Sequence, residues 1–186
     1  MRTVLSCLAG LVLAACGGSE APVSSLVGST NEAPSGLALS ETGLGLVDQS
    51  TAYSSGSISQ ALGGVRVEPV NATDNGRVVS QLAAFGSSGL QLARFRGEGG
   101  RVAQAQIISG DVPGPGGARV GMSYRETNGN SMNCEEGSGS WTQMAVCSRA
   151  GSAITYVYSV PLWTEGRMPR GNELSRAILN RMIWEP

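Results

Sequence analysis

The sequence predicts an α+β domain built on an antiparallel β-meander sheet, with two or three short helices and one intradomain disulfide. Glycine contributes 27 of the 186 residues and aromatic side chains only 5%, a composition typical of many turns around a modest core. Glycine-containing turns separate short segments in which apolar and polar residues alternate, as in half-buried strands. Two cysteines lie in the second half of the same region. We expect a single domain over 37–186, long enough for a real core.

The first 16 residues have the pattern of a bacterial lipoprotein export signal. Arg2 supplies a positive charge, residues 4–13 form an apolar segment, and the signal ends in Leu13-Ala14-Ala15-Cys16, the arrangement that signal peptidase II cleaves before the cysteine. The apolar segment is shorter than the ~20 residues that a membrane-spanning helix needs. We therefore predict a signal peptide over 1–15 and attachment to the membrane through lipid.

Cys16 is the predicted lipidation site. The tetrapeptide resembles the lipobox of bacterial lipoproteins, which implies a diacylglycerol thioether on the Cys16 sulfur and usually a third acyl chain on its nitrogen. Each buried CH₂ contributes ~0.8 kcal/mol, so two or three chains make release negligible. Gly17 is not the aspartate that retains lipoproteins in the inner membrane of enteric bacteria, so we expect the outer membrane. The alternative is an ordinary secretory signal that leaves Cys16 as a free thiol.

Residues 16–36 predict a flexible tether, because they are small and polar, include Pro22 and Pro34, and show no sustained periodicity. The domain is therefore expected to face the periplasm.

The chain has a net charge of −1, which suggests no nucleic-acid partner. All 13 basic residues are arginine, and lysine and histidine are absent. This removes Schiff-base chemistry, the usual imidazole base and the commonest metal ligand, so we assign no cofactor, metal or catalytic residue.

The first half of the domain predicts one helix and a run of strands. We expect a short extended segment at 43–47 and a short helix at 57–63, with a serine N-cap and a glycine stop. Strands are expected at 65–70, 77–85, 90–96 and 101–109, with glycine-containing turns between them. The last two strands have no purely apolar face, since Arg94 shares a face with Leu90 and Leu92, while Gln104 and Gln106 interrupt the apolar pattern of the fourth strand.

The second half predicts a loop, two short helices and two strands. The glycine- and proline-rich stretch 110–117 is a connector and lacks the Lys-Ser/Thr pair of a phosphate-binding loop. A short helix is expected at 122–129 and a capped helix at 172–179, where Leu174 and Ile178 are four residues apart. Strands are expected at 154–160 and 181–184.

Cys134 and Cys147 are the only cysteines of the mature domain besides the lipidated residue. Because the signal directs the chain to an oxidising compartment, a disulfide between them is the natural interpretation. A redox-active pair or a metal site is the alternative, but neither a Cys-x-x-Cys spacing nor a histidine partner is present.

Two further groups invite a functional interpretation. Glu135 and Glu136 are paired acids, as in glycoside hydrolysis, but neighbouring residues in an exposed loop point apart. A solvated loop is therefore the favoured interpretation. Trp163 and Trp184 are candidates for stacking on a sugar, although core or lid packing is the commoner role of such residues.

The order of residues from about Thr42 to Trp184 resembles the RpoE-regulated lipoprotein family, small Gram-negative envelope proteins of unknown function associated with envelope stress. The resemblance implies a compact α+β domain on an outer-membrane lipid anchor, with the two cysteines bonded, and it supplies no catalytic residues. The chain departs from the family pattern in the weak helix after Gly121 and in the serine- and glycine-rich insert before Cys147. The resemblance rests on Ile107-Ile108-Ser109-Gly110-Asp111-Val112-Pro113, Ala118-Arg119-Val120-Gly121, Cys134 and Cys147, Ile154-Thr155-Tyr156-Val157-Tyr158-Ser159, Gly166-Arg167-Met168-Pro169 and Ile183-Trp184.

Two functional hypotheses follow. The preferred one is a non-catalytic envelope lipoprotein that binds a protein, peptide or glycan, or supports envelope integrity. The rival is a hydrolase that uses Ser, Asp or Glu without His and acts on peptidoglycan or lipid. Neither hypothesis assigns ligand-binding residues.

Overall fold

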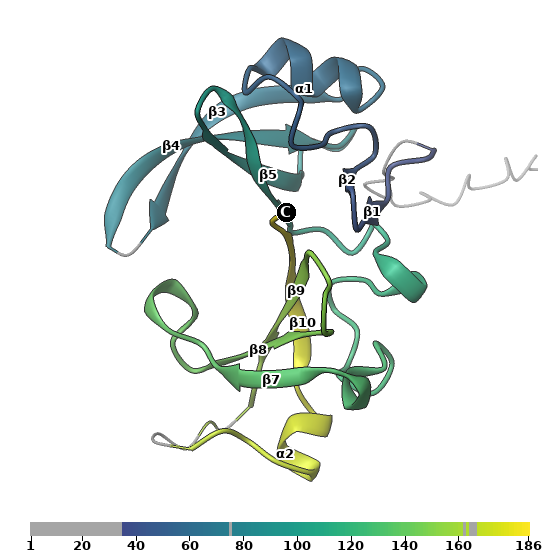
Figure 1. Ribbon diagram of the computed structural model, residues 1–186, viewed down its shortest axis with the longest axis vertical. Helices are drawn as coiled ribbons and strands as arrows, with labels where there is room; N and C mark the ends of the chain where they lie inside the picture. Colours follow the sequence, from purple (N-terminus) through teal and green to yellow (C-terminus); the bar gives the residue numbers. More distant parts are fainter. Residues whose placement is uncertain (1–34, 75, 162, 164–166) are drawn as a thin grey trace, which may run out of the picture.

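The computed structural model of the chain describes residues 35–74, 76–161, 163 and 167–186. Its centre is an eight-stranded antiparallel sheet with the strand order β3-β4-β5-β6-β10-β9-β8-β7, accompanied by a two-stranded sheet of β1 and β2 (Figure 1). This confirms the predicted α+β class. The strands are β1 (Leu39–Ser40), β2 (Gly43–Leu44), β3 (Arg66–Asp74), β4 (Arg77–Phe85), β5 (Gln91–Glu98), β6 (Arg101–Ile107), β7 (Asn133–Glu136), β8 (Met144–Ser148), β9 (Ile154–Ser159) and β10 (Ile178–Trp184).

Strands β3 to β6 form the predicted meander, in which each strand pairs with the next along the chain. Glycines with positive φ make its turns, at Gly76, Gly89 and Gly99–Gly100, because glycine has no Cβ to penalise that conformation. Strict alternation fails in β5, where the pairing with β4 shifts register and Leu92 and Ala93 are both fully buried. A bulge of this kind lets consecutive side chains escape the period of two.

The C-terminal strand joins the two halves of the sheet. β10 lies between β6 and β9, pairing Met182 with Ile107 on one side and with Tyr156 on the other. β9, β8 and β7 continue the sheet as a second meander. Across the pair β7–β8, Cys134 lies directly opposite Cys147 with a Cα–Cα distance of 4.0 Å, and the predicted disulfide is formed.

Helix α1 (Ser55–Ala61) matches the predicted helix with a shift in its start. Its N-cap is Ser54, whose Oγ accepts a hydrogen bond from the backbone N–H of Ser57 at 3.2 Å. Gly63 and Gly64, both at positive φ, follow its end. Among the described residues, no helix is long and apolar enough to cross a membrane.

One helix prediction was wrong and another was too long. Residues 122–129 form successive turns, because the Glu126 carboxylate caps the backbone N–H of Ser123 at 2.7 Å and Asn128 adopts φ +60°. Helix α2 covers only Asn172–Ser175, since Ile178 already pairs with Ser159 in the sheet. In both places tertiary pairing and local side-chain hydrogen bonds outweigh a weak helical preference.

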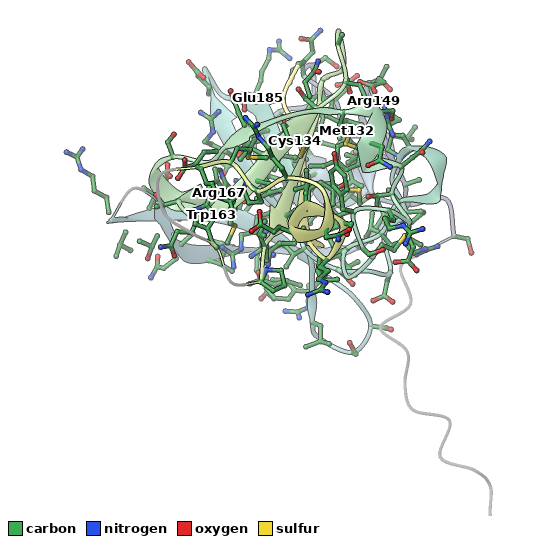
Figure 2. The ribbon with its side chains drawn as sticks, turned by 90° about the horizontal axis from the view of Figure 1, so that it is seen from below. Met132, Cys134, Arg149, Trp163, Arg167 and Glu185 are labelled. Carbon is green, nitrogen blue, oxygen red and sulfur yellow. A yellow bond between two sulfur atoms is a disulfide. The ribbon has the colours of Figure 1, made fainter. Side chains whose placement is uncertain are left out.

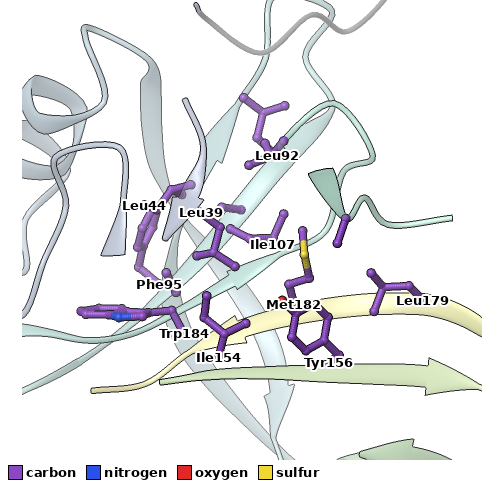
Figure 3. Packing of buried hydrophobic residues seen from close by; sticks show 14 of the residues in the cluster. Leu39, Leu44, Leu92, Phe95, Ile107, Ile154, Tyr156, Leu179, Met182 and Trp184 are labelled. Carbon is purple, nitrogen blue, oxygen red and sulfur yellow. The ribbon is translucent and has the colours of Figure 1, made fainter. Parts of the chain in front are cut away.

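The core lies on one face of the large sheet and includes residues of β1, β2, α1 and the loop 108–121. Figure 3 shows Leu39 and Leu44 beside the sheet residues Phe95, Ile107 and Trp184. Trp184, Phe95 and Tyr156 are among its largest fully buried side chains. The indole N–H of Trp184 donates to the carbonyl of Glu41 at 3.0 Å. Trp184 is therefore a core residue that also connects the β1–β2 turn to the large sheet. It is not a sugar platform.

The stretch 110–117 is a structural connector, as expected. The Arg119 guanidinium donates to the carbonyls of Gly110 and Asp111, each at 2.9 Å. The backbone N–H of Leu39 donates to the carbonyl of Pro113 at 2.8 Å. This segment therefore joins β1 to the core.

Candidate functional site

A polar groove of about 360 Å³ lies on the sheet face opposite the core. Side chains in a strand alternate between faces, so the neighbours of core residues Phe95, Ala105 and Met182 point away from the core. Strands β5, β6 and β10 form the floor of the groove. The residues that line it are Ala72, Thr73, Asp74, Gln81, Arg94, Arg96, Gln104, Gln106, Ser140, Trp141, Arg181 and Glu185.

Two hairpins form the walls. The hairpin β3–β4 projects on one side and the hairpin β7–β8 on the other, and their tips approach each other across the opening (Figure 1). Ser140 Oγ lies 3.4 Å from Asp74 Oδ1, so the tips of the two hairpins meet at the rim. The groove is therefore bounded at its floor and on both sides by regular structure.

The projection of the first wall depends on Tyr53. β4 pairs with β5 only from Leu82 onward, whereas the preceding residues of β4 pair with β3 alone. At this point of separation the Tyr53 hydroxyl accepts from the backbone N–H of Leu82 at 3.1 Å and donates to the carbonyl of Phe95 at 3.0 Å. Burial raises the pKa of Tyr53. Its ring lies over Gly97, where a Cβ atom would collide with it.

The floor holds two arginines without an acidic partner among the described residues. Arg94 donates from Nε to Gln91 Oε1 at 3.0 Å, and Arg181 donates from one terminal nitrogen to the carbonyl of Asn180 at 3.2 Å. Neither forms an ion pair with a described carboxylate. Burial lowers the pKa of Arg181, and the nearby positive charge of Arg94 lowers it further. The two guanidinium groups thus repel each other on one surface.

A fixed network borders these cations. Arg96 forms an ion pair with Glu185 at 2.7 Å, and Gln104 Nε2 donates to the second oxygen of the same carboxylate at 3.0 Å. Gln106 Nε2 in turn donates to Gln104 Oε1 at 2.7 Å. The carboxylate of Glu185 is therefore already satisfied, and the network orients two amide side chains beside Arg94.

Gln81 is a buried polar residue of the groove, with 8% of its surface exposed. Within the part of the chain that the structure describes, its side-chain amide has no hydrogen-bond partner in the protein. The amide atoms of Gln81 are not among the buried unpaired atoms of the described residues, so the amide reaches the solvent of the groove and offers one donor group and one acceptor to a groove occupant.

The residues singled out in the sequence lie elsewhere. Cys16 lies outside the described residues, and its lipidation stays a prediction. Glu135 and Glu136 are exposed neighbours in the edge strand β7. Trp163 lies half-buried on the segment that precedes α2, together with Arg167 (Figure 2), and its indole nitrogen is buried without a described partner.

The sequence analysis missed the groove residues Gln81, Arg94, Arg181 and Trp141 as a site. The signal was present in the polar stripe of Arg94, Arg96, Gln104 and Gln106, which left two meander strands without an apolar face. A polar stripe predicts solvent exposure as readily as a site, and only the insertion of β10 brings Arg181 beside it.

Comparisons with known proteins identify relatives of unknown function. A family model described as "Protein of unknown function (DUF1131)" matches residues 24–186. The uncharacterized protein YfeY of Escherichia coli K12 is 25% identical over 186 residues, which cover 97% of this chain and 96% of that protein. The crystal structure of the uncharacterized protein yfeY from Escherichia coli has the same fold, with a TM-score of 0.64, 24% identity, and coverage of 80% of this chain and 99% of the other.

Proposed function

The chain belongs to the DUF1131 family of proteins of unknown function, and from this starting point we propose that it is a non-catalytic binding module that holds an anionic ligand in its polar groove. The single observation that carries the proposal is the pair Arg94 and Arg181, which repel each other in the groove without a described carboxylate partner. An anion bridging the two guanidinium groups would relieve that repulsion. Arginine suits this role because its planar group binds carboxylates and phosphates with two hydrogen bonds.

The setting proposed for this module is the outer membrane, facing the periplasm through a lipid anchor at Cys16. The support is the tetrapeptide Leu13-Ala14-Ala15-Cys16 and the tether that follows it. Resemblance to the RpoE-regulated lipoproteins extends the proposal to a role in envelope maintenance or stress. Intact-mass measurement of the mature protein tests the anchor: acyl mass on Cys16 is expected, and an unmodified cysteine would rule the anchor out.

The rival hydrolase gains no support from the carboxylate on the floor of the groove. A carboxylate that exchanges protons with a substrate must be free to do so, whereas Glu185 accepts hydrogen bonds from Arg96 and Gln104. The arrangement suits ligand retention better than bond cleavage.

Thermal unfolding of the full chain in detergent tests anion binding, with inorganic phosphate as the probe and chloride keeping the ionic strength constant. A ligand that binds the folded state raises the unfolding temperature. We expect phosphate to raise it for the wild type and for Arg125→Gln, an exposed arginine outside the groove. The response should disappear in the double variant Arg94→Gln/Arg181→Met. Equal responses in all three proteins would overturn the proposal.

A further inference from the structure

We infer that the anionic ligand of the groove is an acidic saccharide, an inference that rests on the proposed function. The groove combines three kinds of side chain that such a ligand requires: guanidinium groups for its charge, amides for its hydroxyls and an indole for its ring. The arginines and amides come from strands β4, β5, β6 and β10 and the indole from the β7–β8 hairpin, so their convergence is a property of the folded chain.

The charge of the ligand is assigned to Arg94 and Arg181. Arg94 uses Nε to hold Gln91, which leaves both of its terminal nitrogens without a described partner. Arg181 likewise has donors left after its bond to the carbonyl of Asn180. Two such groups match the two or more oxygens of a carboxylate or phosphate. Three arginines line the groove against the two carboxylates of Asp74 and Glu185, so its lining is positive by one charge in a chain whose net charge is −1.

The hydroxyl groups of the ligand are assigned to the amides. Gln81 lines the groove and its amide has no described partner, and Gln106 retains its carbonyl oxygen after donating to Gln104. A primary amide both donates and accepts, as a sugar hydroxyl does.

Trp141 supplies the apolar surface. It lies half-exposed on the β7–β8 wall, after the groove-lining Ser140 at the rim. A tryptophan ring offers a large rigid face at low entropic cost, with its polar N–H at the edge. The C–H face of a pyranose ring packs on such a surface while its hydroxyls remain available to the amides.

An acidic peptide fits the groove less well. Peptides commonly bind by adding a strand to a free sheet edge or by placing apolar side chains in pockets. The floor strands β5, β6 and β10 are each paired on both sides, so they offer no free edge. Ala72 and Trp141 are the apolar residues among those that line the groove. The groove therefore offers a peptide neither a free strand edge nor a set of apolar pockets.

The test compares three probes on the full chain in detergent at constant ionic strength: a trisaccharide of galacturonic acid, its neutral methyl ester and tri-glutamate. Calorimetric titration should give at least about tenfold tighter binding of the acidic trisaccharide than of the other two. Trp141→Ala should weaken trisaccharide binding about tenfold, the effect typical of a tryptophan hot spot. The same variant should keep the wild-type response to inorganic phosphate. Trp163→Phe, which changes a tryptophan outside the groove, is the matched control.

The outcomes separate the two claims. If phosphate stabilises the chain through Arg94 and Arg181 but the trisaccharide binds no better than tri-glutamate, the saccharide inference fails and the proposed function stands. If the arginine substitutions change the binding of neither phosphate nor the trisaccharide, both the proposed function and the saccharide inference fail. If the methyl ester binds as well as the acid, the charge assignment to Arg94 and Arg181 is wrong.

Discussion

Burial lowers the pKa of Arg181 on β10, and the positive charge of Arg94 on β5, across the intervening strand β6, lowers it further. No described carboxylate offsets this repulsion, although the neighbouring Arg96 has Glu185. A local arrangement that lowers stability without an evident structural gain is expected where a site is kept for function. The repulsion between Arg94 and Arg181 can therefore be measured through its effect on stability, without knowing the ligand.

Replacing Arg181 with methionine should raise stability. Methionine keeps an unbranched stem over the sheet but removes the charge, so we expect a gain of about 0.5 kcal/mol in the free energy of unfolding, the scale of a cross-strand charge pair. Denaturant unfolding at low salt measures it. Arg119→Met is the control and should lose about 2 kcal/mol, because Arg119 donates to two backbone carbonyls. Similar losses in both variants would contradict a functional origin of the Arg181 charge.

Removing the disulfide should destabilise the domain through its unfolded state. The bond joins residues 13 positions apart, and a closed loop of about that size contributes ~3 kcal/mol. Chemical denaturation of Cys134→Ala/Cys147→Ala should show this loss, and wild type treated with reductant should match the variant. A difference below about 1 kcal/mol would mean that the β7–β8 pair is held by other contacts.

Stability should fall between pH 10 and pH 12 because of Tyr158. Burial raises its pKa to about 12, and its hydroxyl lies 2.7 Å from the Thr127 hydroxyl. With a folded pKa above the unfolded one, the stabilisation is complete below pH 10 and disappears as pH rises through 12. Tyr158→Phe should be less stable at pH 8, but the difference from wild type should shrink by about 1 kcal/mol at pH 11. A constant difference would show that Tyr158 titrates normally.

The close contact between Gly97 and Tyr53 predicts a coupled pair of substitutions. Gly97→Ala places a methyl group against the Tyr53 ring and should cost about 1–3 kcal/mol, as overpacking does. In a Tyr53→Ala background the same change should cost much less, which a double-mutant cycle detects. Gly56→Ala, in α1 with open space around it, is the control and should be neutral or stabilising. Additive effects of the two substitutions would show that the Tyr53 side chain does not fill the space where β4 and β5 separate.

The meander and the disulfide were predictable because their signals are local. Glycine turns at Gly76, Gly89 and Gly99–Gly100 separate segments of period two, and adjacent strands joined by short turns nearly always pair. The disulfide between the two cysteines was inferred from the oxidising compartment that the signal predicts. Neither inference needed knowledge of residues distant in sequence.

The groove was not predictable because it depends on long-range pairing. β10 could have joined either meander at an edge, and its insertion between β6 and β9 decides that Arg181 faces Arg94. The same insertion shortened the predicted helix at 172–179 to α2, since Ile178 is needed in the sheet. The position of β10 in the sheet thus determines both the strand order and where the helix α2 ends.

The most direct test of the central claim is a nuclear magnetic resonance titration of the arginine Nε–Hε signals in the full chain. Inorganic phosphate would be added at constant ionic strength, with signals assigned by single Arg→Gln substitutions. The account predicts that the signals of Arg94 and Arg181 shift together with one dissociation constant, while those of the exposed Arg77 and Arg125 do not. Shifts of equal size at all four arginines, or none at Arg94 and Arg181, would contradict it.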